Sequence, residues 1–278
     1  MDTKVIYFSD PVHDDFAGNN IKTIEVSEKY RYSSSDNPVY LVVETLLYLI
    51  AVPIIFLMNK IIYRVSYKNR AVLRKAGRQG YFLYGNHTNA MLDAYNPALS
   101  ALPKKAHIIV NPDATSIPGI RWLVKIFGAI PVPTSRPTMA NFRACIQRHV
   151  EKGRVIAIYP EAHIWPWYTG IRPFPSVSFH YPAELDRPCF AMTNTYQKSR
   201  IFRHPRVVTY FDGPFHPDMS LPKKQRVEKL RNEVYAAMQA RAAAVPQQEW
   251  IHYEYRPLAE GSADVPAGER QDDRPGSC

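Results

Sequence analysis

The apolar segment from Val39 to Leu57 constrains this chain more than any other feature. It is interrupted only by Glu44, Thr45 and Pro53. About twenty helical residues reach roughly 30 Å, the thickness of a bilayer core. Insertion of its Val, Leu, Ile and Phe side chains into a bilayer lowers the free energy by more than the cost of inserting one glutamate near a helix end. We therefore expect a membrane-associated helix rather than a buried core helix. Pro53 leaves two arrangements open, a helix that spans the bilayer and a re-entrant pair.

A basic segment follows the apolar one and supports the same interpretation. It contains seven cationic residues and no acidic one, namely Lys60, Arg64, Lys68, Arg70, Arg74, Lys75 and Arg78. Such charge beside an apolar helix stays on the cytoplasmic side and attracts anionic membrane lipids. The net charge of +10 also favours anionic partners. No nucleic-acid-binding motif is visible, so we expect no nucleic-acid partner. The predicted location is the cell membrane, with the catalytic domain on the cytoplasmic side.

Composition divides the chain into four parts. Residues 1–37 form a polar N-terminal extension with one strand expected near Ile21–Val26, and residues 38–78 form the membrane-associated helix and basic segment. Residues 79–245 form the main domain. Residues 246–278 form a C-terminal tail that we expect to be partly disordered, because its end is rich in Gly, Pro and acidic residues. The nine histidines show no metal-ligand spacing, and we expect neither a metal nor another cofactor.

The main domain alternates between predicted strands and helices. The strands are expected at Tyr81–Tyr84, His107–Val110, Val155–Tyr159, Cys189–Thr193 and Val207–Phe211. The helices are expected at Asn89–Ala101, Ile120–Phe127, Met139–Val150 and Lys223–Ala243. This alternation predicts an α/β fold, with a mostly parallel sheet flanked by helices. The active site of such a sheet lies at the carboxyl ends of its strands.

One polar segment follows the first of these strands. It runs from Asn86 to Asp93 and places His87 and Asp93 six positions apart. Six helical positions turn through about 600°, so the two side chains would not face each other on a regular helix, and His87 must precede the helix. A histidine held by a carboxylate can accept a proton from a hydroxyl group near neutral pH. A polar turn with a helix start is the simpler alternative.

This segment and three blocks that follow it along the chain resemble the sequence blocks of the glycerolipid acyltransferase family. That family includes the 1-acylglycerol-3-phosphate acyltransferases. In order, the blocks are Asn86-His87 to Asp93, Gly128-Ala129-Ile130-Pro131, Tyr159-Pro160-Glu161-Ala162 and Pro188-Cys189-Phe190-Ala191-Met192. The resemblance spans roughly Ile61 to Ala243. This chain departs from the family pattern in three ways: five residues instead of four separate His87 from Asp93, Thr134 replaces an arginine, and Ala162-His163 replaces Gly-Thr.

The resemblance implies an enzyme that transfers a fatty acyl group from acyl-ACP or acyl-CoA to 1-acyl-sn-glycerol-3-phosphate, forming phosphatidic acid. It makes His87 the catalytic base and Asp93 the residue that orients it. It also places Asn86 and Glu161 among the substrate-binding residues. The acceptor phosphate needs a cationic clamp, for which the alternatives are Arg136, close to the missing arginine, and Arg172. For each arginine the simpler alternative is a surface residue, and for Glu161 it is a helix or turn cap.

Two other functions remain compatible with the sequence. The acceptor could be glycerol-3-phosphate or another lysolipid, with the same chemistry. Alternatively, the chain could be a non-catalytic lipid-binding protein on this scaffold, which the altered second and third blocks would allow. Retention of both His87 and Asp93 favours an enzyme.

Overall fold

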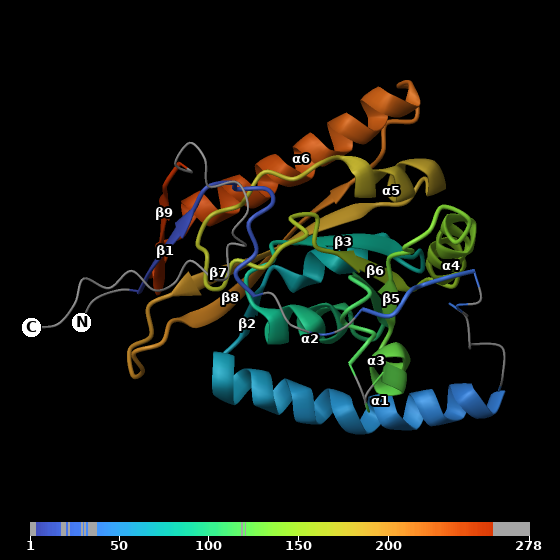
Figure 1. Cartoon of the computed structure of the whole chain (residues 1–278), viewed down its shortest axis with the longest axis horizontal. Coiled ribbons are helices and arrows are strands. Elements are labelled where there is room, and N and C mark those ends of the chain that lie inside the picture. Colours follow the sequence, from blue (N-terminus) through green and yellow to red (C-terminus); the bar gives the residue numbers. More distant parts are fainter. Residues whose placement is uncertain are drawn as a thin grey trace, which may run out of the picture.

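A computed structural model describes residues 4–17, 21, 23–28, 30, 32, 38–117, 119 and 121–257. Its centre is a seven-stranded sheet with the order β2-β8-β7-β3-β6-β4-β5 (Figure 1). Every neighbouring pair is parallel except β7 and β8. The mostly parallel α/β fold predicted from the sequence is therefore confirmed. A separate two-stranded parallel sheet joins β1 to β9.

The elements follow the predicted order closely. The strands are β1 (Lys4–Phe8), β2 (Ser66–Lys68), β3 (Tyr81–Gly85), β4 (Ala106–Val110), β5 (Ala129–Pro131), β6 (Val155–Ile158), β7 (Cys189–Gln197), β8 (Arg206–Phe215) and β9 (Ile251–Tyr255). The helices are α1 (Pro38–Met58), η1 (Asn59–Tyr63), η2 (Arg70–Ala76), α2 (Ala90–Ala101), α3 (Arg121–Ile126), α4 (Met139–Glu151), η3 (Val177–Phe179), α5 (His180–Leu185) and α6 (Lys223–Ala244).

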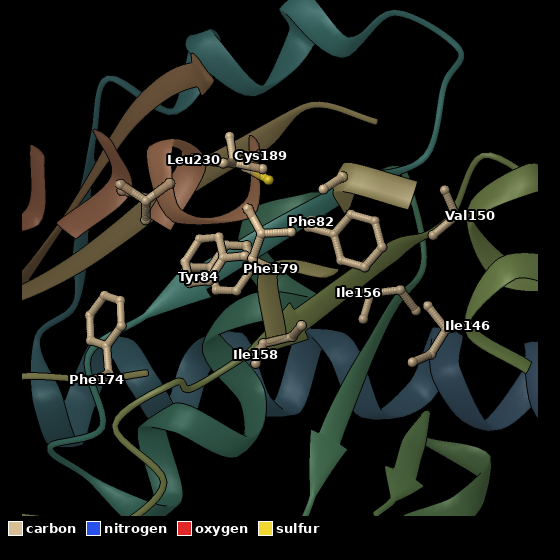
Figure 2. Close-up of a cluster of buried hydrophobic side chains, with 14 of the residues drawn as sticks. Phe82, Tyr84, Ile146, Val150, Ile156, Ile158, Phe174, Phe179, Cys189 and Leu230 are labelled. Carbon is tan, nitrogen blue, oxygen red and sulfur yellow. The ribbon is translucent and has the colours of Figure 1, made fainter. Parts of the chain in front are cut away.

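Both faces of the sheet are buried, because side chains alternate between two apolar layers along each strand. On β3, Phe82 and Tyr84 point into the layer covered by α4, α5 and α6 (Figure 2). Tyr81 and Leu83 point into the opposite layer, which η2 and α2 cover. Burial on both faces explains why the central strands read as continuous apolar runs. It also fixes the strand register, since a shift by one residue would exchange the two layers.

Helix α1 lies lengthwise along the domain, beneath α2 and α3 in Figure 1. It continues through Pro53, so the break that the sequence left open does not occur. Within the described part of the chain, one segment, Val42–Tyr63, is long and apolar enough to cross a membrane, and very little of it is buried. Its acidic residue, Glu44, is buried against the domain and pairs with Lys105 at 2.5 Å. This ion pair attaches one side of α1 to the domain and leaves an apolar side exposed.

The two ends of the chain differ from the sequence-based expectation. Among the described residues of Ile21–Val26 no strand forms; the N-terminal strand is instead β1, which pairs with β9. The presumed tail therefore contributes a strand at Ile251–Tyr255, where alternating polar and aromatic residues gave a weak signal. The expectation of disorder concerns residues 258–278, which lie outside the described residues.

Candidate active site

The turn between β3 and α2 carries the central histidine. β3 ends at Gly85, and Asn89 caps α2 by accepting a hydrogen bond from the backbone N–H of Leu92 at 3.0 Å. Asparagine is among the best N-capping residues, so the local sequence dictates where the helix begins. His87 therefore lies before the helix, and the longer spacing to Asp93 is absorbed in the turn. The imidazole is 18% exposed and stacks on the ring of Tyr159 with a centroid separation of 4.7 Å.

The buried carboxylate of Asp93 holds this turn together. Its Oδ2 atom lies 2.8 Å from Nδ1 of His87 and accepts hydrogen bonds from the backbone N–H groups of Thr88 and Asn89, both at 3.0 Å. An ionised carboxylate can only accept, so Nδ1 of His87 carries a proton and Nε2 carries a lone pair. The predicted pairing of His87 with Asp93 is therefore present in the geometry.

A residue that the sequence analysis did not identify orients the other oxygen of Asp93. Asn194, on β7, donates from Nδ2 to Oδ1 of Asp93 at 3.1 Å. Its own Oδ1 accepts from Thr209 at 2.7 Å and from Asn96 at 3.0 Å. These two donors fix the orientation of the Asn194 amide, so that its N–H group faces the carboxylate. The available sequence signal was an asparagine shortly after the apolar start of a predicted strand, Cys189–Met192.

Asn86 links the histidine turn to the same strand. Its side chain donates to the backbone carbonyl of Asn194 at 3.0 Å, and its Oδ1 accepts from the backbone N–H of Asn194 at 2.8 Å. Both polar ends of the amide are occupied, and the residue is 1% exposed. In this structure Asn86 joins β3 to β7 beyond the end of their ladder, which supports a positioning role rather than contact with a substrate.

Glu161 and Arg172 form a buried pair beside His87. Glu161 accepts from the backbone N–H of His87 and from the backbone N–H of Arg172, both at 2.9 Å. The Arg172 guanidinium lies 3.4 Å from the same carboxylate and is 1% exposed. Burial raises the pKa of Glu161, while Arg172 and the two N–H groups oppose that shift. Arg172 therefore neutralises Glu161, and its burial makes it a poor site for an incoming phosphate.

The loop after Glu161 is tied both to the histidine turn and to the N-terminal segment. The backbone N–H of Trp165 donates to the carbonyl of His87 at 3.1 Å, and its indole N–H donates to the carbonyl of Asp14 at 2.7 Å. Ala162, which replaces the family glycine, adopts φ = 63°. That left-handed conformation favours glycine, so the substitution retains the turn at some cost in free energy. The N-terminal extension thus packs on the loop that positions Glu161.

Arg136 occupies a different place. It is exposed on the turn between β5 and α4, at the same carboxyl edge of the sheet as His87. Strands β6 and β4 separate β5 from β3. The structure therefore brings together Asn86, His87, Asp93, Glu161 and Arg172, and leaves Arg136 outside this cluster.

Among the described residues, no group of three or more His, Cys, Asp and Glu side chains is arranged to hold a metal ion.

This arrangement is suited to base catalysis. His87 presents Nε2 at a partly exposed position, while its other nitrogen is bound to an aspartate that would stabilise the imidazolium. The aspartate is fixed by three backbone or side-chain N–H donors besides the histidine. Such a site can deprotonate a hydroxyl group of a bound molecule without a cofactor.

Comparisons with known proteins agree with this fold. Residues 64–193 match the family model described as Acyltransferase. A solved structure with a similar fold is the 1-acyl-sn-glycerophosphate acyltransferase PlsC from Thermotoga maritima, with a TM-score of 0.50 and 11% sequence identity. The match covers 70% of this chain and 81% of that one. A search of the curated proteins found no match. All four sequence blocks lie within or at the border of the matched residues. Residues 64–193 are thus similar to the acyltransferase family, and the fold resembles that of a glycerolipid acyltransferase.

Proposed function

We propose that this chain transfers a fatty acyl group from acyl-ACP or acyl-CoA to the hydroxyl of 1-acyl-sn-glycerol-3-phosphate, forming phosphatidic acid for phospholipid biosynthesis. The observation that carries the proposal is the contact between Nδ1 of His87 and Oδ2 of Asp93, 2.8 Å long, within an acyltransferase domain. A lipid acceptor agrees with the exposed apolar helix α1 beside that domain.

The proposed reaction needs one base and no covalent acyl-enzyme. Nε2 of His87 takes the proton of the acceptor hydroxyl while its oxygen attacks the thioester carbonyl. The carbon–sulfur bond then breaks, the new ester bond remains, and the proton passes to the leaving thiolate. Asp93 stabilises the imidazolium between these two transfers. Base catalysis of this kind contributes about 10²–10⁴-fold to the rate.

An acceptor panel tests the function. Purified full-length protein is mixed with radiolabelled acyl-ACP or acyl-CoA and with lysophosphatidate, glycerol-3-phosphate or lysophospholipids that lack a phosphomonoester. We expect labelled phosphatidic acid from lysophosphatidate. Transfer only to another acceptor would replace the proposed substrate and retain the chemistry. No transfer to any acceptor from either donor would favour a non-catalytic lipid-binding protein.

We further propose that the chain works at the cell membrane, with its catalytic domain on the cytoplasmic side. The exposed side of α1 supplies the apolar contact, and the basic segment of residues 60–78 supplies cations beside it. Cations flanking an apolar helix remain in the cytoplasm and attract anionic headgroups. A lysolipid acceptor would then be taken from the membrane, while a water-soluble acyl donor arrives from the cytoplasm.

Arg136 is our proposed clamp for the acceptor phosphate, because its guanidinium is exposed at the carboxyl edge of the sheet. A charge-assisted contact to phosphate is worth about 1.5–3 kcal/mol, which corresponds to roughly ten- to a hundredfold in affinity. We therefore expect Arg136→Ala to raise the lysophosphatidate KM at least about tenfold and to leave the donor KM nearly unchanged. Steady-state kinetics with each substrate varied in turn measures both values. Arg187→Ala, before the amino end of β7 at the opposite edge, is the control. An unchanged acceptor KM for Arg136→Ala would place the clamp elsewhere.

Asn194 is our proposed positioning residue for Asp93. Asn194→Ala removes the donor to Oδ1 of Asp93, while the two backbone donors still hold Oδ2. We expect kcat to fall about tenfold, as one hydrogen bond to a charged group is worth about 1.5–3 kcal/mol. Both KM values should remain similar.

A control on the same strand separates positioning from stability. Thr195→Val removes a buried hydrogen bond, 2.9 Å long, from Thr195 to the carbonyl of Val208. We expect this variant to lose stability without a loss of kcat. If Asn194→Ala behaves in the same way, Asn194 has only a structural role.

A further inference from the structure

The loop between β7 and β8 exposes two large apolar side chains at its tip. Ile201 is 86% exposed and Phe202 is 58% exposed. Isolated exposed apolar residues are common, but adjacent ones at the tip of a hairpin form a patch that suits an interaction with an apolar partner. Neither residue belongs to the acyltransferase site described above. We call the segment from Lys198 to Pro205 the hairpin tip.

Arg64 fixes the position of the hairpin tip. Its guanidinium donates to Oγ of Ser199 at 3.0 Å and to the carbonyl of His204 at 2.6 Å. It also lies over the ring of Phe202, 4.5 Å from the centroid. Ser199 Oγ in turn accepts from the backbone N–H of Phe202 at 3.2 Å. The tip is therefore attached to the protein body, and the direction in which its apolar side chains point is set.

These contacts join the hairpin tip to the exposed apolar side of α1 and η1. Arg64 follows η1 directly, and η1 exposes Ile61 and Ile62 by 68% and 57%. Along α1 the exposed apolar side chains continue with Val39, Val42, Val43, Leu46, Leu49, Ile50, Ile54, Phe56 and Leu57. In Figure 1 the end of α1 near β2 lies on the same side of the molecule as the β7–β8 loop. The tip thus extends an apolar surface that begins on the helix.

The charge around the tip identifies the partner. Lys198, Arg200, Arg203 and Arg206 surround Ile201 and Phe202, and all four are exposed. No acidic residue occurs between Asp186 and Asp212. Apolar side chains flanked by lysine and arginine match the boundary between acyl chains and anionic headgroups of a lipid leaflet. Long cationic side chains can reach the headgroups while their neighbours enter the apolar region.

We propose that the hairpin tip is a second membrane contact, which binds the same anionic leaflet as α1. This inference rests on the membrane association in the proposed function. With the tip and α1 engaged together, α1 lies in the plane of the leaflet, because its Glu44 side remains paired with Lys105 of the domain. Two contacts at one leaflet bring the domain to a fixed orientation over the lipid surface.

Vesicle flotation of the full-length protein tests the proposal. The vesicles contain phosphatidylcholine with or without phosphatidylglycerol, and the double variant Ile201→Ser/Phe202→Ser is compared with the wild type. We expect the variant to bind the anionic vesicles at least about tenfold more weakly, since it removes two apolar side chains from contact with the lipid. The variant loses the contact of Arg64 with the Phe202 ring but keeps the Arg64 hydrogen bonds to Ser199 and His204, so the melting temperature should change little.

Three comparisons make the result decisive. Val177→Ser, which removes a 67% exposed apolar side chain from η3, should bind vesicles like the wild type. Arg200→Gln/Arg203→Gln should lose most of the preference for anionic vesicles. Acyl transfer to lysophosphatidate in detergent micelles should be the same for the wild type and the tip variants, so that loss of binding is distinguished from failure of the proposed reaction.

Equal vesicle binding by the wild type and the Ile201→Ser/Phe202→Ser variant would overturn the proposal. If that variant also showed a raised KM for acyl-ACP, the tip would instead be a docking surface for the acidic carrier protein. A wild type that binds vesicles through the tip but transfers no acyl group would refute the proposed reaction and leave the membrane contact standing.

Discussion

His87→Ala should reduce acyl transfer by at least about a hundredfold, the lower end of the contribution of a general base. The substitution removes Nε2, the only basic atom that the structure places at a partly exposed position beside Asp93 in the described site. Binding of the substrates should change little, since the imidazole acts on the hydroxyl proton during the reaction. We therefore expect the loss in kcat rather than in either KM, measured with purified protein and labelled acyl donor.

The surface of the same chain offers a matched control. His252 also contacts a carboxylate, that of Glu249 at 3.0 Å, but the imidazole is 46% exposed and distant in sequence from the acyltransferase blocks. His252→Ala should retain the activity of the wild type. Near-normal activity of His87→Ala, with melting temperatures equal for all proteins, would remove His87 from the proposed mechanism and with it the role of Asp93.

The sequence predicted the central sheet because local pattern and burial agree there. The strand at Tyr81–Tyr84 is buried on both faces, so its apolar run is unambiguous. The helix after it begins at a strong capping residue, Asn89. In contrast, the three-residue strands at Ser66–Lys68 and Ala129–Pro131 are too short to show a period of their own. They form because longer neighbours offer hydrogen-bonding edges.

Long-range contacts account for the parts of the site that the sequence did not reveal. Asn194 lies 101 positions from Asp93, and only the pairing of β7 with β3 brings its amide to the carboxylate. Asp14 lies 151 positions from Trp165, and their hydrogen bond makes a polar extension part of the site's support. Motif spacing identified His87 and Asp93 because these two residues share one turn. It could not show whether Arg172 faces solvent or the buried Glu161.

The burial of Arg172 beside Glu161 leads to the second large expected effect. Arg172→Ala should lower the free energy of unfolding by about 3–5 kcal/mol, as is typical when one partner of a buried ion pair is removed. For a chain of this size the melting temperature should fall by at least about 6 °C. The remaining Glu161 would be buried without its cation, and it accepts the backbone N–H of His87. Displacement of Glu161 should therefore lower kcat as well, whereas a phosphate clamp would change mainly the acceptor KM.

The effect of Arg172→Ala should depend on pH in a defined direction. Burial already raises the pKa of Glu161 above its ordinary value of 4.5, and loss of Arg172 removes the main opposing charge. A carboxyl group whose folded-state pKa is raised stabilises the fold below its unfolded pKa and loses that contribution as pH rises through the folded value. The stability deficit of the variant should thus be smaller near pH 4.5 than at pH 8, as thermal unfolding at both values would show.

A surface ion pair provides the control for this experiment. Lys229 contacts Asp218 at 2.8 Å, and the two side chains are 47% and 31% exposed. Lys229→Ala should leave the melting temperature nearly unchanged, because exposed ion pairs are weakened by solvent. A different result would contradict this prediction: Arg172→Ala is equally mild, keeps its kcat and raises only the acceptor KM. In that case the Arg172 guanidinium would move away from Glu161 and bind the acceptor phosphate, and the buried pair would exist only in the enzyme without its acceptor.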